Sequence, residues 1–250
     1  PVRRKLRLSN KLRLMNKIIR IILLLLLPSL HLLAEKSSLR IVSYNVENLF
    51  DTQHDTLKND FSYMPDGTHH WSYYRYKTKV NRIAQVLVNI GGWESIPLVG
   101  LCEVENAKCL GKLCYFLRCY NYQFVHYDSA DERGVDVALL YDSTRIQILD
   151  SKPLHVSLEG DATRDILYVS ALYQQQDTIH TLVCHLPSQL GGTVETTWKR
   201  QRAQQVIQNK IDSILMHQPD AKIVVMGDMN TLPKDDLNKM YNMMLPIQKS

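Results

Sequence analysis

Five polar residues stand at the ends of four apolar, strand-like segments. The segments IVSYN, LVGLCE and TLVCH end at Asn45, Glu103 and His185, and IVVMGDMN ends with Asp228 and Asn230. A buried strand needs only apolar residues, so polar residues at its end indicate the rim of an active site. Mg²⁺ prefers oxygen ligands such as carboxylates, and histidine can transfer a proton near neutral pH. These residue types therefore suit metal-assisted attack on phosphorus.

The GDMN motif shows how such a site could be assembled. Gly227 lets the backbone turn, and Asp228 and Asn230 lie two residues apart. Alternate residues of an extended chain share a face, so the carboxylate and the amide can converge on one point. Because Gly, Asp and Asn are also common in turns, the motif alone is better explained as an ordinary turn.

The remaining candidates also have ordinary explanations when each is taken alone. Glu103 follows a buried run, where a carboxylate is costly unless it is paired or binds a cation; a salt bridge would serve as well. A lone His185 is more often structural. Asn45 could bind a metal or donate a hydrogen bond to a substrate phosphate oxygen, but it could also simply cap a strand end. Arg133 could hold a phosphate through its planar guanidinium, although an exposed loop arginine usually has no specific role.

Helical and strand-like segments alternate from Ser38 onward and must position these residues. Apolar spacing predicts helices over 74–90 and 106–117. A third helix is predicted with Thr196 or Thr197 as its cap and Pro219 at its end. Strands are predicted over 39–46, 96–104, 122–127, 135–141, 146–149, 166–174 and 178–186, and in the segment AKIVVMGD.

The order of these segments predicts an α/β fold of packed sheets with helices on their outer faces. Several neighbouring strands look like hairpins, among them the pair joined at Gln175–Asp177. No internal linker divides residues 38–250, so we expect one domain there. The strand order does not follow from the sequence.

The N-terminal segment carries the excess positive charge. Residues 1–34 contain eight Lys or Arg and no acid, and the remainder has 22 basic and 25 acidic residues, a balance of about −3. The overall charge of +5 therefore gives no evidence for nucleic-acid binding. We expect residues 1–14 to be an upstream extension that is not native.

Residues 15–34 are typical of a signal peptide, with Lys17 and Arg20 before a short apolar run. This predicts export to the periplasm or the extracellular space, with transient membrane contact through the signal segment. Bulky Leu32 lies where a small residue is expected before cleavage after Ala34, so an uncleaved membrane anchor is the alternative. Five cysteines, an odd number, predict buried or unpaired thiols rather than a disulfide framework.

In this order, GDMN, HLPS and the strand ending at Glu103 resemble the endonuclease/exonuclease/phosphatase superfamily, which includes pancreatic-type deoxyribonucleases, AP endonucleases and inositol phosphate phosphatases. The resemblance extends over about residues 39–250, and phrases such as SYNVENLFD and DERGVDVALLY are similar to a bacterial, often exported branch. It implies a four-layer α/β sandwich of two packed, mainly antiparallel sheets flanked by helices, with the site at one rim.

The resemblance also implies a role for each strand-end residue. Asn45 and Glu103 would hold a divalent metal, Mg²⁺ or Mn²⁺. Asp228 and Asn230 would surround the nucleophilic water, and His185 would assist at the scissile phosphate. The expected activity is hydrolysis of a phosphoester by a monomeric enzyme.

Substrate recognition is less well defined by the resemblance. Arg133 matches the family pattern less closely and is expected to contact a substrate phosphate. The substrate class stays open among nucleic acid, phospholipid and sugar phosphate. Nuclease, phosphodiesterase and phosphatase activities are therefore all consistent with the sequence.

One departure from the family pattern lies near the C-terminus. Family members finish on a strand with an Asp-His pair, whereas the sequence after Asn230 contains Asp235 and Asp236 but no histidine. We expect the domain at 38–250 to be C-terminally incomplete, so this polypeptide would itself be inactive. The alternative is a non-catalytic binding or scaffold protein that has lost this pair, because a fold does not fix a function.

Overall fold

The computed structural model describes residues 15, 17, 39–158, 160, 162–189 and 192–231. The described residues from Arg40 onward belong to one compact unit. The predicted extension over 1–14 and signal segment over 15–34 lie outside the described residues, apart from Met15 and Lys17, and so does the segment after residue 231. Within the described part of the chain, no helix is both long and apolar enough to cross a membrane.

Strands and helices follow the alternation that the sequence predicts. The helices are η1 (Phe61–Tyr63), α2 (Tyr73–Gly91), α3 (Ala107–Phe116) and α4 (Thr193–His217). The strands are β1 (Ile41–Leu49), β2 (Leu98–Val104), β3 (Tyr122–His126), β4 (Asp136–Asp142), β5 (Ile146–Leu154), β6 (Ile166–Tyr173), β7 (Asp177–His185) and β8 (Lys222–Asp228).

The predicted cap of the last helix is wrong. Helix α4 begins at Thr193 with Gly192 as its N-cap, so Thr196 lies inside the first turn. The Thr196 hydroxyl donates a hydrogen bond to the Gly192 carbonyl over 2.7 Å. A threonine hydroxyl can bond backward to the carbonyl four residues earlier as readily as it caps a helix, and the sequence did not distinguish the two.

The strands form two four-stranded sheets with the orders β1-β2-β4-β3 and β5-β6-β7-β8. Strands β1 and β2 are parallel, as are β7 and β8, whereas the other paired neighbours are antiparallel. The two mixed, mainly antiparallel sheets confirm the predicted fold class. The predicted β6–β7 hairpin is also confirmed, with Tyr173 opposite Asp177.

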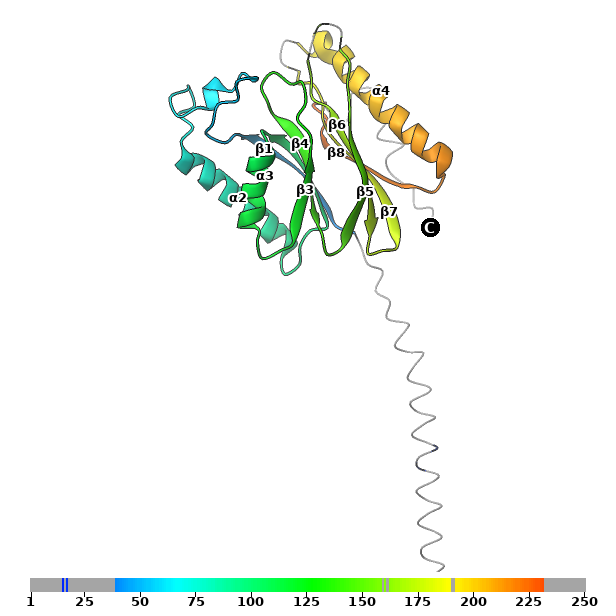
Figure 1. The fold of residues 1–250 in the computed structure, drawn as a ribbon. Helices are drawn as coiled ribbons and strands as arrows, with labels where there is room; N and C mark the ends of the chain where they lie inside the picture. Colours follow the sequence, from blue (N-terminus) through cyan, green and yellow to red (C-terminus); the bar gives the residue numbers. More distant parts are fainter. Residues whose placement is uncertain are drawn as a thin grey trace, which may run out of the picture. The chain divides into compact units, whose positions relative to one another are not determined.

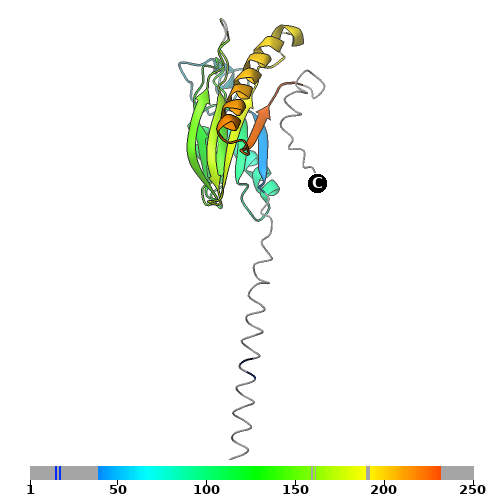
Figure 2. The same cartoon turned by 90° about the vertical axis from the view of Figure 1, so that its right-hand side faces the viewer.

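Helices cover the outer face of each sheet (Figures 1 and 2). Helix α2 turns Val80, Ile83 and Leu87 into one buried cluster with the first sheet and α3. Helix α4 packs Ala203 and Ile207 into a separate cluster with the second sheet. Apolar residues at this spacing form one stripe on a helix, so each helix buries that stripe against a sheet.

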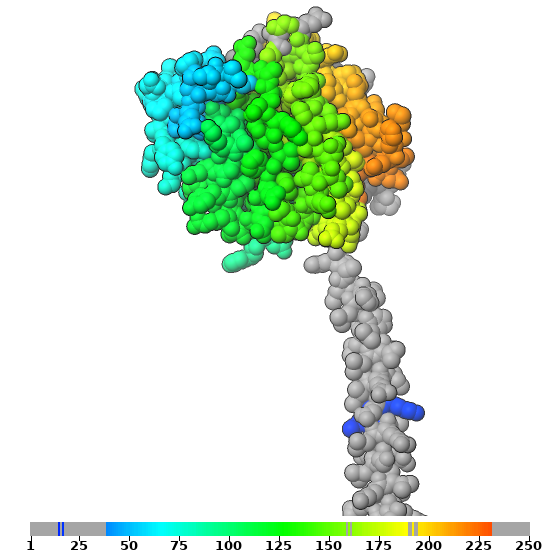
Figure 3. Space-filling model, in the orientation of Figure 1, coloured from blue at the N-terminus to red at the C-terminus, as the bar shows by residue number. Residues whose placement is uncertain are grey.

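The inner faces of the two sheets pack against each other. A Cβ atom added to Gly100 of β2 would lie 2.8 Å from Sδ of Met226 in β8, and the Cys102 thiol donates to the Cys184 carbonyl over 3.4 Å. On the face seen in Figure 3, the green and yellow-green segments of the two sheets form one continuous surface. The five cysteines, all within the described part of the chain, are unpaired, as predicted.

Candidate functional site

Each sheet contributes one parallel strand pair to the candidate site. In β1 and β2, Asn45 lies opposite Cys102, the residue before Glu103. In β7 and β8, His185 lies directly opposite Asp228. Parallel strands end at the same edge of a sheet, so each pair delivers two polar residues to one edge.

Hydrogen bonds join these residues across the two sheets. Nδ2 of Asn45 donates to Oε1 of Glu103 over 3.2 Å and to Oδ2 of Asp228 over 3.0 Å. Nε2 of His185 lies 3.7 Å from the same Glu103 oxygen. Four of the five predicted strand-end residues thus form one cluster, although Asn45 and Asp228 are 183 positions apart.

Irregular backbone sets the direction of the side chains. The β1–β2 pairing shifts register between Asn45 and Leu49, and Glu103 has a φ of +66°. A non-glycine residue in the left-handed region is uncommon and costs energy, and such residues concentrate at functional sites. A bulge re-aims a side chain, which accounts for a glutamate pointing to the rim from a strand that is otherwise buried.

Asn45 presents its amide nitrogen, and not its oxygen, to the two carboxylates. Its Oδ1 accepts a hydrogen bond from the backbone N–H of Glu47 over 2.9 Å, and that contact fixes the orientation. An amide nitrogen is a donor only and cannot bind a cation. In this arrangement the Asn45 amide nitrogen bridges Glu103 and Asp228, and the role of Asn45 at a metal stays a prediction.

Asn230 supports Asp228 from the adjoining turn. Its backbone N–H donates to Oδ1 of Asp228 over 3.0 Å, and its Nδ2 donates to the Leu186 carbonyl over 2.8 Å. Asn230 has a φ of +48°, a conformation that asparagine tolerates better than most residues. The structure thus places Asn230 next to Asp228, with its amide nitrogen bound to the β7 end.

His185 is neutral at pH 7 because of where it lies. Its side chain is buried, and Nδ1 has no hydrogen-bond partner among the described residues. Burial, and then the positive charge of Arg164, lower the pKa of His185 to about 3. Sequence analysis expects His185 to assist at the scissile phosphate; burial disfavours the protonated ring, and the neutral ring can still act as a hydrogen-bonding group.

Arg133 lies on the loop between β3 and β4, and its guanidinium is half exposed. Nε of Arg133 lies 3.9 Å from Oδ1 of Asp131, and its positive charge lowers the pKa of His185. The side chain is thus close enough to act on the site electrostatically. No hydrogen bond joins Arg133 to Asn45, Glu103 or Asp228 among the described residues.

Sequence analysis missed Arg164, a buried arginine beside the site. Its Nη2 lies 3.3 Å from Oδ2 of Asp131, and its Nε donates to the Val135 carbonyl over 3.2 Å. The positive charge of Arg164 lowers the pKa of His185. The negative charge of Glu103 in turn acts to raise the pKa of Arg164. No sequence signal identified it, because its burial depends on the β3–β4 loop folding over it.

The donor set is consistent with a divalent cation. Carboxylates from opposite sheets converge on one amide, and Nε2 of His185 lies 3.7 Å from Oε1 of Glu103. Two carboxylates near each other repel unless a donor or a cation lies between them. Glu103 and Asp228 supply the oxygen ligands that Mg²⁺ and Mn²⁺ prefer.

Comparisons with known proteins agree with this geometry. A family model described as the Endonuclease/Exonuclease/phosphatase family matches residues 40–248. A sequence search among curated proteins finds no match.

Solved structures share the fold at low sequence identity. An endonuclease/exonuclease/phosphatase from Bacteroides vulgatus is 15% identical with a TM-score of 0.58, covering 83% of this chain and 72% of that one. Humanized D. rerio TDP2 with 14 mutations is 16% identical with a TM-score of 0.52, covering 83% and 67%. ANGEL2, described as a 2′,3′-cyclic phosphatase, is 17% identical with a TM-score of 0.58, covering 81% and 56%.

Proposed function

Since the chain belongs to the endonuclease/exonuclease/phosphatase family, we propose that it is a divalent-metal-dependent phosphoester hydrolase. The observation that carries this proposal is the bridge from Asn45 to Glu103 on one sheet and to Asp228 on the other. It brings two carboxylates to one point at the sheet rim. A metal-dependent phosphoester hydrolase needs such a point to hold a cation beside the reacting phosphate.

Glu103 and Asp228 would hold the cation, with Asn45 fixing their separation. The cation would polarise a phosphoryl oxygen as a Lewis acid. The Asp228 carboxylate, whose Oδ1 is held by the Asn230 backbone N–H, would orient the attacking water and take up its proton. Neutral His185 would donate a hydrogen bond to a phosphate oxygen, in the manner of a preorganised oxyanion donor.

Positive charge for the substrate would come from the two arginines. Arg133 is exposed enough to contact a phosphate directly, whereas Arg164 is buried and would act through the loop that it holds. A planar guanidinium can bind two phosphate oxygens at once. The proposed substrates are nucleic acid, phospholipid or sugar phosphate.

Hydrolysis of bis-p-nitrophenyl phosphate, DNA and phosphoinositides by a C-terminally completed chain, measured with Mg²⁺ or Mn²⁺ and again with EDTA, tests this proposal. We predict turnover that requires the metal. Glu103→Gln should lower kcat/KM by at least about 100-fold, the scale on which removing one preorganised electrostatic group acts.

Glu132→Gln is the matched control, because Glu132 is an exposed glutamate on the β3–β4 loop. It should leave kcat/KM unchanged. The proposal fails if no substrate turns over with either metal, which would favour a scaffold role. It also fails if turnover survives both Glu103→Gln and Asp228→Asn.

A further inference from the structure

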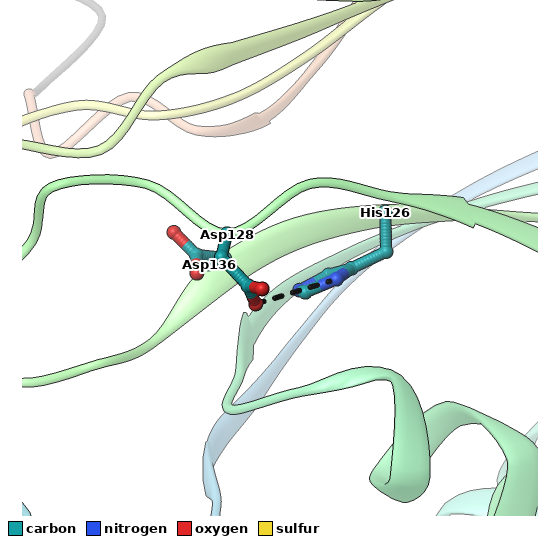
Figure 4. A group of neighbouring side chains, drawn as sticks. All are labelled: His126, Asp128 and Asp136. Carbon is teal, nitrogen blue, oxygen red and sulfur yellow. Dashed lines mark ion pairs between the residues drawn. The ribbon is translucent and has the colours of Figure 1, made fainter. Parts of the chain in front are cut away.

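A second group of potential ligands lies at the base of the β3–β4 loop. His126 ends β3, Asp136 begins β4, and Asp128 follows β3 by two residues. One ligand atom from each residue lies within 4.8 Å of the others. Figure 4 shows the His126 imidazole directed toward the two carboxylates, with its Nδ1 3.9 Å from Oδ1 of Asp128. We call these three residues the loop-base cluster.

The burial of His126 and its unpartnered nitrogen are an independent indication that an ion binds at the loop-base cluster. Its side chain is only 4% exposed, and Nε2 has no hydrogen-bond partner among the described residues. Buried polar atoms nearly always have a partner, so such an exception calls for an explanation. Burial also lowers the pKa of His126, which favours the neutral ring that metals bind.

The buried carboxylate of the loop-base cluster is held ready by its neighbours. Asp136 is only 3% exposed, and it accepts hydrogen bonds from the hydroxyl and the backbone N–H of Ser129. Metal ligands are commonly oriented in this way by surrounding hydrogen bonds. The Lys58 ammonium, whose charge acts on Asp136, donates its hydrogen bonds to the backbone carbonyls of Ser129 and Asp131.

We propose that His126, Asp128 and Asp136 form a binding site for a divalent transition-metal ion of the Zn²⁺ class. One imidazole and two carboxylates suit such an ion, whereas Mg²⁺ favours oxygen ligands alone. Ligand distances of about 2.0–2.2 Å would draw the three ligand atoms, now within 4.8 Å of one another, closer together. The site is separate from the Glu103 and Asp228 pair and does not depend on the proposed hydrolase activity.

A metal at the loop-base cluster would close the β3–β4 loop. The cluster joins the end of β3 to the start of β4, and the loop between them carries Asp131 and Arg133. Asp131 accepts a hydrogen bond from the Arg133 backbone N–H over 3.1 Å and pairs with buried Arg164. The bound ion would therefore restrict the motion of the β3–β4 loop, which carries Asp131 and Arg133 beside the candidate active site.

Titration of the full chain with Co²⁺, followed by visible absorption, tests this site. Co²⁺ bound through an imidazole gives ligand-field bands, and Zn²⁺ added afterwards should displace it. Asp128→Asn is the main variant, because Asp128 is 78% exposed and its amide should not disturb folding. We expect this variant to weaken Co²⁺ binding at least tenfold and His126→Asn to abolish the bands.

Asp66→Asn is the matched control, since Asp66 is an exposed aspartate on another loop. It should bind Co²⁺ as the wild type does. Glu103→Gln should also keep the loop-base bands, which separates this site from the proposed catalytic one. Wild-type protein without saturable bands, or bands that survive in Asp128→Asn and His126→Asn alike, would overturn the proposal.

Discussion

At the scale of single residues, Asn45 determines how the candidate site is held together without a metal. Its amide donates to a carboxylate on each sheet, so one side chain both neutralises the local repulsion and joins the two layers. Hydrogen bonds to charged groups contribute about 1.5–3 kcal/mol each. Asn45 therefore contributes to the free energy of unfolding through the same two carboxylates that are the candidate metal ligands.

Replacing this donor with an isosteric acceptor should expose that link. Asn45→Asp would bring a third carboxylate to Glu103 and Asp228, and we predict a loss of about 2–4 kcal/mol in the free energy of unfolding without metal. Added Mg²⁺ should recover part of this loss, because a third carboxylate strengthens a cation site. Urea unfolding with and without Mg²⁺ measures both effects.

Asn209→Asp on the exposed face of α4 is the control for Asn45→Asp. Asn209 accepts a hydrogen bond from Gln205 through its Oδ1, and an aspartate preserves that acceptor. We expect less than about 0.5 kcal/mol of change, as for most surface substitutions. Equal losses in the free energy of unfolding for Asn45→Asp and Asn209→Asp would contradict the bridging role of Asn45.

At the scale of elements, the close approach of β8 to β7 sets the position of Asp228. Gly227 has a φ of +135°, and a Cβ atom there would lie 1.8 Å from the Cys184 carbonyl oxygen. The contact is with backbone, which cannot swing aside as a side chain can. Only glycine suits this position, and the next residue is Asp228.

Two glycine substitutions should therefore have opposite effects. Gly227→Ala should destabilise the fold by at least about 2 kcal/mol, because it adds a backbone clash to an unfavourable φ. Gly111→Ala, within helix α3 where nothing lies within 4 Å of the new Cβ, should stabilise by about 0.5–1 kcal/mol. Thermal unfolding of both variants measures these changes in stability. A Gly227→Ala variant as stable as the wild type would contradict the backbone clash between β8 and β7.

The elements show which features could be predicted from sequence. Apolar spacing predicted the helices and strands because burial leaves a periodic pattern, and polar residues at the strand ends indicated which side chains lie together at the sheet rim. Three features left no such pattern. The sheet order and the position of Arg164 depend on long-range contacts, and the amide orientation of Asn45 depends on one backbone N–H.

At the scale of the whole molecule, buried charge should make stability depend on pH. Glu105 is a buried residue in the connection between β2 and α3, and its Oε1 has no hydrogen-bond partner among the described residues. Its other oxygen accepts the Asp51 backbone N–H. Burial, with added repulsion from Asp51 and other nearby carboxylates, raises the pKa of Glu105 to about 8. The protonated form is therefore the stable one in the folded protein.

The direction of the pH effect follows from this raised pKa. Between about pH 4.5 and pH 8 the folded state holds a proton at Glu105 that the unfolded chain releases. The contribution of this group to the free energy of unfolding is therefore fully present below about pH 4.5 and is lost as the pH rises through 8. Glu105→Gln should remove this loss, making the variant more stable than the wild type near pH 8.5 by up to a few kcal/mol.

Urea unfolding near pH 5 and near pH 8.5 tests this expectation. Glu132→Gln removes an exposed carboxylate and is the control, for which we expect no change in the pH dependence. A Glu105→Gln variant that loses stability with rising pH as steeply as the wild type would show that Glu105 does not titrate in this range.

The central claim is that Glu103 and Asp228 hold a divalent cation between the two sheets. Calorimetric titration of the protein with Mg²⁺ tests it most directly, with Glu103→Gln as the variant and Asp66→Asn, at an exposed aspartate outside both proposed sites, as the control. We predict that Glu103→Gln weakens Mg²⁺ binding at least tenfold while Asp66→Asn leaves it unchanged. Mg²⁺ binding that is equally strong in wild type and Glu103→Gln would contradict the account.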